Sequence, residues 1–256
     1  MHVIESISYR ADAGAYGEGD LYLPDAAVGA RCALVIHGGG WNAMDRRRMQ
    51  GISAFLCRIG LAVFNIDYRL LPHAPWPACA DDCLQAARFL LDADHPALAG
   101  LKRDRLLVLG ASAGGHLALM TGLGLDRARV AGIVSIAGPS DLTAPEMQPL
   151  LDGVGFLRDA PARADALRSA SPVHHIVAGP PPLLVLHSFN DRLVPLSQGE
   201  AVAKAWIAAR GVVQSYVYDG AGSAHGIWVD TSLPPRLLPE LEAQIEVFCR
   251  AVCRPA

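Results

Sequence analysis

The stretch Gly110-Ala111-Ser112-Ala113-Gly114-Gly115 is the most informative part of this 256-residue chain. Four apolar residues, 106–109, lead directly into it, and the small-residue run 116–120 follows, which predicts a strand, a sharp turn and a helix. Glycines two residues either side of Ser112 allow the backbone to turn tightly, so the hydroxyl is exposed above a helix N-terminus. A serine held in this way is suited to attack a carbonyl carbon. The rest of the chain would then have to supply a base, an acid and an oxyanion hole.

Apolar runs and helix-forming segments alternate along the remainder of the chain. Strands are predicted at residues 2–10, 18–23, 32–36, 61–66, 105–109, 130–137, 183–187 and 212–218. Helices are predicted at residues 46–59, 77–92, 113–124, 197–210 and 236–253. Uniformly apolar strands that alternate with helices are typical of parallel sheets with right-handed crossovers. We therefore expect one α/β domain over residues 1–256, with a mostly parallel central sheet and helices on both faces.

The segment 139–180 interrupts this alternation. It is rich in Pro, Gly and Asp, and it has the pattern of one or two short helices. Long excursions inside compact domains are usually lids or binding loops, so the segment is a candidate short cap. A packed surface excursion without a role at the site is the alternative.

The composition excludes several classes of protein. Apolar residues make up 52% and charged residues 18%, as in a compact globular protein, and the net charge of −3 gives no basic field for nucleic acid. No apolar run reaches the roughly 18 residues of a membrane span, and residues 1–5 do not resemble a signal peptide. Six cysteines, at positions 32, 57, 79, 83, 249 and 253, form no C-x-x-C pair. They predict buried free thiols, no metal site and a cytoplasmic location.

The loops that follow the strands are where partners of Ser112 are expected, since ligands bind at the carboxyl ends of strands in open α/β sheets. The strand at 32–36 is followed by His37-Gly38-Gly39-Gly40-Trp41. Successive glycines can aim free backbone N–H groups at a ligand. Together with the N–H of Ala113, such donors would form an oxyanion hole. A plain glycine-rich turn is the alternative.

Two further loops offer an acid and a base. Asp191 follows the strand at 183–187, where a carboxylate could orient an imidazole, and His225 follows the strand at 212–218 in a loop of small residues. The order Ser112, Asp191, His225 is the one that α/β-hydrolases use. Asp219 and Asp141 also follow strands, and they are the alternative acids.

Two charged stretches are interpreted as structural. The run Arg46-Arg47-Arg48 is expected to be the solvated first turn of a helix, with Asp45 as its N-cap. In Asp67-Tyr68-Arg69, we expect an internal ion pair that braces the loop under the site.

Taken together, these motifs resemble those of the hormone-sensitive-lipase-like esterases of the α/β-hydrolase superfamily. The resemblance rests on residues 37–41, 67–72, 77–82 and 110–118 and on the loops of Asp191 and His225. It implies an oxyanion hole formed by Gly39, Gly40 and Ala113, a triad of Ser112, Asp191 and His225, and an α/β-hydrolase fold.

Some positions depart from the lipase-like pattern. Ala111 and His116 stand where those proteins usually have aspartate and asparagine, and only about 36 residues precede the oxyanion loop. The chain is therefore closer to small, lightly capped relatives, which include bacterial carboxylesterases, feruloyl or acetyl-xylan esterase-like proteins and arylformamidases. Trp41 and Trp228 are expected either to line the substrate pocket or to pack in the core.

The resemblance implies a serine hydrolase of small carboxylic esters that works through an acyl-enzyme and needs no cofactor. Arylformamidase activity, an amide hydrolysis of the kynurenine formamidase type, is the alternative with the same triad. A small-molecule ester is the expected partner, and a homodimer is left open.

Overall fold

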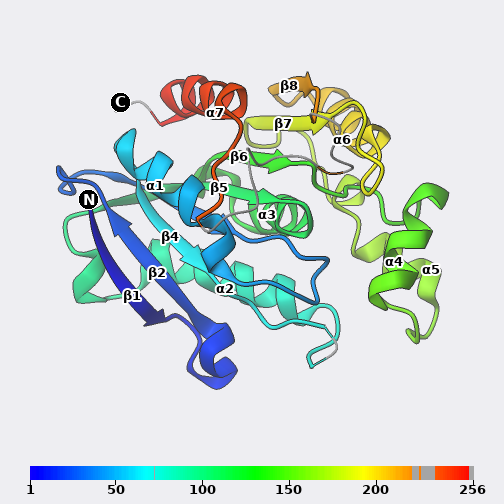
Figure 1. Ribbon diagram of the computed structural model, residues 1–256, viewed down its shortest axis with the longest axis horizontal. Helices are drawn as coiled ribbons and strands as arrows, with labels where there is room; N and C mark the ends of the chain where they lie inside the picture. Colours follow the sequence, from blue (N-terminus) through cyan, green and yellow to red (C-terminus); the bar gives the residue numbers. More distant parts are fainter. Residues whose placement is uncertain (72, 221–224, 226–233, 254–256) are drawn as a thin grey trace.

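The computed structural model describes residues 1–71, 73–220, 225 and 234–253 (Figure 1). Within these residues, eight strands form one sheet in the order β1-β2-β4-β3-β5-β6-β7-β8. The strands are β1 (His2–Ser8), β2 (Glu18–Leu23), β3 (Arg31–Ile36), β4 (Ala62–Ile66), β5 (Lys102–Ala111), β6 (Val130–Ile136), β7 (Leu183–Ser188) and β8 (Val213–Tyr218). Strand β2 is antiparallel to β1 and β4, and all the other neighbouring strands are parallel. The predicted mostly parallel sheet is confirmed.

Helices cover both faces of the sheet, as predicted. The α-helices are α1 (Gln50–Arg58), α2 (Ala78–Asp92), α3 (Ala113–Gly124), α4 (Gln148–Val154), α5 (Arg163–Ser169), α6 (Leu196–Ala208) and α7 (Pro239–Val252). Short 3-10 helices are η1 (Ala11–Gly17), η2 (Arg46–Met49), η3 (Pro96–Leu98), η4 (Arg127–Arg129), η5 (Pro145–Met147) and η6 (Pro172–His174). Buried residues of α1 and α7 form a core with one face of the sheet, and those of α2, α3 and α6 form a second core with the other face.

Strand β3 shows why the apolar runs become central strands. All of its residues are buried. Because side chains alternate along a strand, Ala33 and Val35 pack in the core that includes α1 and α7, while Leu34 and Ile36 pack in the other. Burying a large aliphatic side chain contributes roughly 1.5–3 kcal/mol. A uniformly apolar strand therefore stabilises a sheet that is covered on both sides.

Several predicted elements have different ends in the structure, and β5, for example, spans Lys102–Ala111 where residues 105–109 are predicted. The first strand stops at Ser8, and the residues that follow form η1. The helix predicted at 46–59 begins as the 3-10 turn η2 and becomes α1 at Gln50. Asp45 is the N-cap of this turn, as predicted, because its carboxylate accepts the N–H of Arg47 at 2.9 Å.

The segment 139–180 contains the two short helices α4 and α5, which lie at one end of the molecule beyond β7 and α6 (Figure 1). It is anchored by side chains of its own. Phe156 is fully buried, and its ring centroid lies 4.6 Å from that of Trp41. Phe156 thus anchors the segment to the core.

Candidate active site

Ser112 occupies a sharp turn between β5 and α3. Its backbone has φ +56° and ψ −123°, a conformation that residues with a side chain rarely adopt. The turn is held by hydrogen bonds from Ser112 N–H to the carbonyl of Ile136, at 2.8 Å, and from His116 N–H to the carbonyl of Ser112, at 3.1 Å. Gly114 lets the helix lie against β3, since a Cβ there would come within 2.2 Å of the Ile36 carbonyl oxygen. The predicted strand, turn and helix are confirmed.

The glycine loop after β3 has the donors that an oxyanion hole needs. Gly39 has φ +105°, and a Cβ there would lie 2.1 Å from the carbonyl oxygen of Ala43, so glycine is required. Within the part of the chain that the structure describes, the N–H groups of Gly39 and Gly40 donate no hydrogen bond. Ala113 is the first residue of α3, and helix geometry leaves its N–H without an acceptor inside the helix.

The structure brings His225 and Asp191 together. His225 Nδ1 lies 2.6 Å from Asp191 Oδ2, and the Asp191 side chain is only 1% exposed. The other oxygen, Oδ1, accepts the N–H groups of Leu193 and Val194 at 2.9 Å each. The carboxylate is therefore fixed by its own turn. Its contact with Nδ1 favours the tautomer of His225 that carries the proton on that nitrogen.

Of the predicted residues, Ser112, His225, Gly39 and Gly40 share one pocket of about 310 Å³. It is lined by Ser112, His225 and the glycines of the loop. Its other walls are Asn42, Ala43, Met44, Arg48, Met49, Ala111, Leu150, Val154 and Leu193. Two of these residues, Leu150 and Val154, belong to α4, so the segment 139–180 supplies part of the wall. The walls are mainly apolar, which suits a small organic ligand.

The two alternative acids have other contacts. Asp141 Oδ1 accepts the N–H of Thr143 at 3.0 Å, within its own turn. Asp219 Oδ1 accepts a hydrogen bond from the Asn190 side chain, also at 3.0 Å. The contact between Asp191 and the imidazole of His225 favours Asp191 as the acid.

Trp41 does not line this pocket. Of its two predicted places, the pocket wall is wrong and the core is right. The side chain is fully buried in the core, and its Nε1–H donates to His116 Nδ1 at 3.1 Å. His116 in turn donates from Nε2 to the carbonyl of Ala170 at 2.7 Å. Trp41 therefore links the glycine loop to α3 through this buried hydrogen bond, because His116 belongs to α3. Trp228, the other predicted pocket residue, lies outside the described residues.

Two buried histidines near the site have structural contacts that the sequence did not predict. His116 bridges Trp41 and the segment 139–180, and His37 stacks on Tyr68 with ring centroids 4.2 Å apart. Burial lowers the pKa of each, to about 4. Both are therefore neutral at physiological pH. In neutral His116, the lone pair on Nδ1 and the N–H on Nε2 match its two hydrogen bonds. Their positions after a strand and on a buried helix face were the only signals in the sequence.

The predicted ion pair between Asp67 and Arg69 is wrong. Asp67 pairs instead with Arg46, whose backbone N–H it also accepts at 2.7 Å. Arg69 makes two hydrogen bonds of 2.8 Å with Asp82, whose side chain is fully buried. Each of the two side chains therefore has its partner on another element and not two residues away in the same loop.

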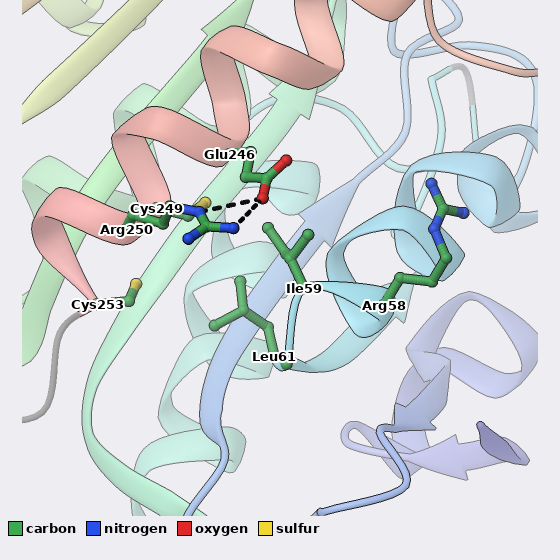
Figure 2. Close-up of a pocket in the computed structure, with 8 residues that line it drawn as sticks. Arg58, Ile59, Leu61, Glu246, Cys249, Arg250 and Cys253 are labelled. Carbon is green, nitrogen blue, oxygen red and sulfur yellow. Dashed lines mark hydrogen bonds and ion pairs between the residues drawn. The ribbon is translucent and has the colours of Figure 1, made fainter.

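A larger cavity, of about 650 Å³, lies between the end of α1 and α7 (Figure 2). It is lined by Arg58, Ile59, Gly60, Leu61, Glu246, Cys249, Arg250 and Cys253. Figure 2 shows Arg250 paired with Glu246 along the helix, at 2.6 Å. Burial raises the pKa of the Cys253 thiol to about 11 and that of Cys249 still further. These thiols are protonated at neutral pH and are therefore poor nucleophiles.

All six cysteines are free thiols, as predicted, and five of them are buried. No group of three potential metal ligands occurs among the residues that the structure describes. Within the same residues, no helix is long and apolar enough to cross a membrane.

Residues 20–206 match the BD-FAE family, and this match covers well over half of the chain. The chain belongs to the BD-FAE family. It is 32% identical to the probable carboxylic ester hydrolase LipM of Mycobacterium tuberculosis, over 64% of this chain and 42% of LipM. It is also 32% identical to the hormone-sensitive lipase of Bos taurus, over 39% of this chain and 13% of the lipase. The BD-FAE chain spans about half the length, or less, of the first curated relatives it matches.

The fold of this BD-FAE member is also found in solved structures. A truncated form of a carbohydrate esterase from gut microbiota superimposes with a TM-score of 0.79 and 21% sequence identity, over 99% of this chain and 97% of the other. The predicted α/β-hydrolase fold and the resemblance to hormone-sensitive-lipase-like esterases are confirmed.

Proposed function

We propose that this protein is a serine hydrolase that cleaves small carboxylic esters through an acyl-enzyme. The observation that carries the proposal is the pocket itself, where Ser112 lies with the glycine loop and with His225, whose imidazole contacts Asp191 at 2.6 Å. A hydroxyl on a strained turn, an oriented imidazole and unused N–H donors are the parts that acyl transfer needs. The family and its esterase-named relatives support the same activity.

In this mechanism, His225 takes the proton of Ser112 as the serine oxygen attacks the ester carbonyl. The N–H groups of Gly39, Gly40 and Ala113 stabilise the oxyanion of the tetrahedral intermediate, and each such donor is typically worth about 10²–10³ in rate. His225 then returns the proton to the leaving alcohol. Water activated by the same imidazole hydrolyses the acyl-enzyme, and Asp191 stabilises the imidazolium in both halves.

The pocket limits the size of the substrate. A volume of about 310 Å³ lies at the lower end of the range for small-molecule sites, so short acyl chains are expected. Because α4 contributes Leu150 and Val154 to the wall, we propose that the segment 139–180 acts as a short cap. The free thiols favour a cytoplasmic location, where cysteines stay reduced.

The test is hydrolysis of 4-nitrophenyl acetate and butyrate by the wild-type protein and by Ser112→Ala. The variant should lose at least about 10³ in kcat, because the nucleophile is gone, while its circular dichroism spectrum is unchanged. Ser169→Ala, at an exposed serine that ends α5, is the matched control and should be fully active. A fluorophosphonate probe should label the wild-type protein and not Ser112→Ala. Substantial turnover by Ser112→Ala would overturn the mechanism.

A second comparison of substrates distinguishes ester hydrolysis from formamide hydrolysis. LipM is named a probable carboxylic ester hydrolase and the gut-microbiota protein a carbohydrate esterase, which favours esters over the formamide alternative. We expect kcat/KM for 4-nitrophenyl acetate to exceed that for N-formylkynurenine. The reverse order would make the protein an amide hydrolase with the same residues.

A further inference from the structure

The three consecutive arginines 46–48 have different environments. Arg46 reaches into an acidic group, with Asp67 as one partner and Asp20 Oδ1 at 2.9 Å from its Nε. Arg47 folds back on Asp45, at 2.5 Å. Arg48 has no ion pair and no hydrogen bond from its side chain within the described residues, and it lines the pocket that contains Ser112. The expected solvated turn thus describes Arg47 but not its two neighbours.

The permanent charge among the described residues that line the pocket is of one sign, positive. Arg48 is the one permanently charged side chain among the described residues that line it, and none of these residues is acidic. The side chain is half-buried against apolar walls, where a charge is screened less than on an open surface. A guanidinium in such a place binds a carboxylate through two parallel hydrogen bonds. The pocket is therefore suited to a ligand that carries a negative charge.

We propose that Arg48 binds an anionic group of the substrate, which makes esters with a second, ionised carboxylate the preferred class. The inference rests on the proposed esterase function and specifies its substrate. A sphere with the volume of the pocket is roughly 8 Å across, so the carboxylate and the scissile ester lie a few bonds apart. Half-esters of short dicarboxylic acids have this spacing on the acyl side, and acyl esters of a hydroxybenzoate have it on the alcohol side.

Matched substrate pairs test the proposal. On the acyl side, the 4-nitrophenyl half-ester of glutarate is compared with 4-nitrophenyl hexanoate, a neutral chain of similar length. On the alcohol side, 4-acetoxybenzoate is compared with its methyl ester. In one of the two pairs, the wild-type protein should have a kcat/KM about tenfold higher for the anionic member, through a lower KM. The side on which the preference appears locates the carboxylate.

Variants at two neighbouring arginines assign the preference to a residue. Arg48→Gln should reduce the ratio of kcat/KM for the anionic ester to kcat/KM for the neutral ester about tenfold. Arg48→Lys should retain part of this ratio, since the lysine keeps the charge but lacks the planar guanidinium that makes two parallel hydrogen bonds. Arg47→Gln is the matched control, because it removes the same charge one residue away, and it should keep the wild-type ratio. Added NaCl should weaken the wild-type preference.

The outcomes separate this proposal from the esterase proposal. Hydrolysis of the neutral esters without any preference for the anionic members would overturn the role of Arg48 and leave the esterase function standing. An equal loss of the ratio in Arg47→Gln and Arg48→Gln would also overturn it, since the effect would then be one of overall charge. Failure of the wild-type protein on all four esters would instead count against the esterase function.

Discussion

Asp191 uses both carboxylate oxygens. Oδ2 lies 2.6 Å from Nδ1 of His225, while Oδ1 accepts two backbone N–H groups of the following turn at 2.9 Å each. Three contacts thus hold the carboxylate in one orientation. The orientation of the imidazole is therefore tied to the turn at residues 191–194.

Asp191→Asn should reduce kcat by about 10⁴ if Asp191 is the acid of the triad. The amide is neutral and presents a donor group, so it can neither stabilise an imidazolium nor maintain the required tautomer. Turnover of 4-nitrophenyl acetate measures the loss. Asp219→Asn is the control, because that carboxylate follows the neighbouring strand and contacts Asn190. A mild loss for Asp191→Asn with a severe one for Asp219→Asn would transfer the role to Asp219.

Gly114→Ala should destabilise the protein by more than about 3 kcal/mol, as backbone clashes do. The added Cβ would come within 2.2 Å of the Ile36 carbonyl oxygen and within 2.5 Å of that of His37, and neither backbone segment can withdraw easily. Gly153→Ala is the matched control in α4, where nothing lies within 4 Å of the added Cβ. It should be neutral or stabilising, by up to about 1 kcal/mol. Urea denaturation of both variants measures the difference, and equal midpoints would contradict the close packing of α3 on β3.

The free energy of unfolding should fall as the pH is lowered from about 6.5 to about 4. His37 and His116 have a pKa of about 4 in the folded protein, below the 6.5 of an unperturbed imidazole. The unfolded chain therefore takes up protons first in this interval, and protonation favours unfolding. For each histidine, stability falls by about 1.4 kcal/mol per pH unit across the interval between its unfolded and folded pKa. Above about pH 7, these two residues no longer make the free energy of unfolding depend on pH.

The variant His116→Gln removes one of these groups. Its unfolding free energy, measured by urea denaturation at about pH 7 and about pH 5, should depend less on pH than that of the wild-type protein. The variant should also be less stable at the higher pH, because a buried hydrogen-bond pair is disturbed. An unchanged pH slope would show that His116 does not titrate as its burial requires.

The parts of the structure that could be predicted from the sequence depend on nearby residues. The turn at Ser112 follows from glycines on either side of it, and most of β3 follows from the unbroken apolar run 32–36. Their chemistry is local, so a short window contains the information. The segment of Asp191 is predictable for the same reason, since its turn follows directly from β7.

The errors concern partners that are distant in the chain. The sequence pattern favours Arg69 as the partner of Asp67, but Asp67 pairs with Arg46 from the turn before α1. The position of Trp41 beside the glycine loop leaves the pocket wall and the core equally open, and its indole finds an acceptor on α3. In both cases the sequence shows the residue type, but it does not show the direction in which the side chain points. Direction is set by tertiary packing, which no local pattern specifies.

The chain of hydrogen bonds from Trp41 through His116 to Ala170 constrains sequence change. A buried acceptor that loses its donor costs about 1–3 kcal/mol, so replacing the indole alone leaves His116 Nδ1 unsatisfied. Replacing the imidazole alone leaves both the indole N–H and the carbonyl unsatisfied. Positions 41 and 116, which lie 75 residues apart, should therefore change together among homologues.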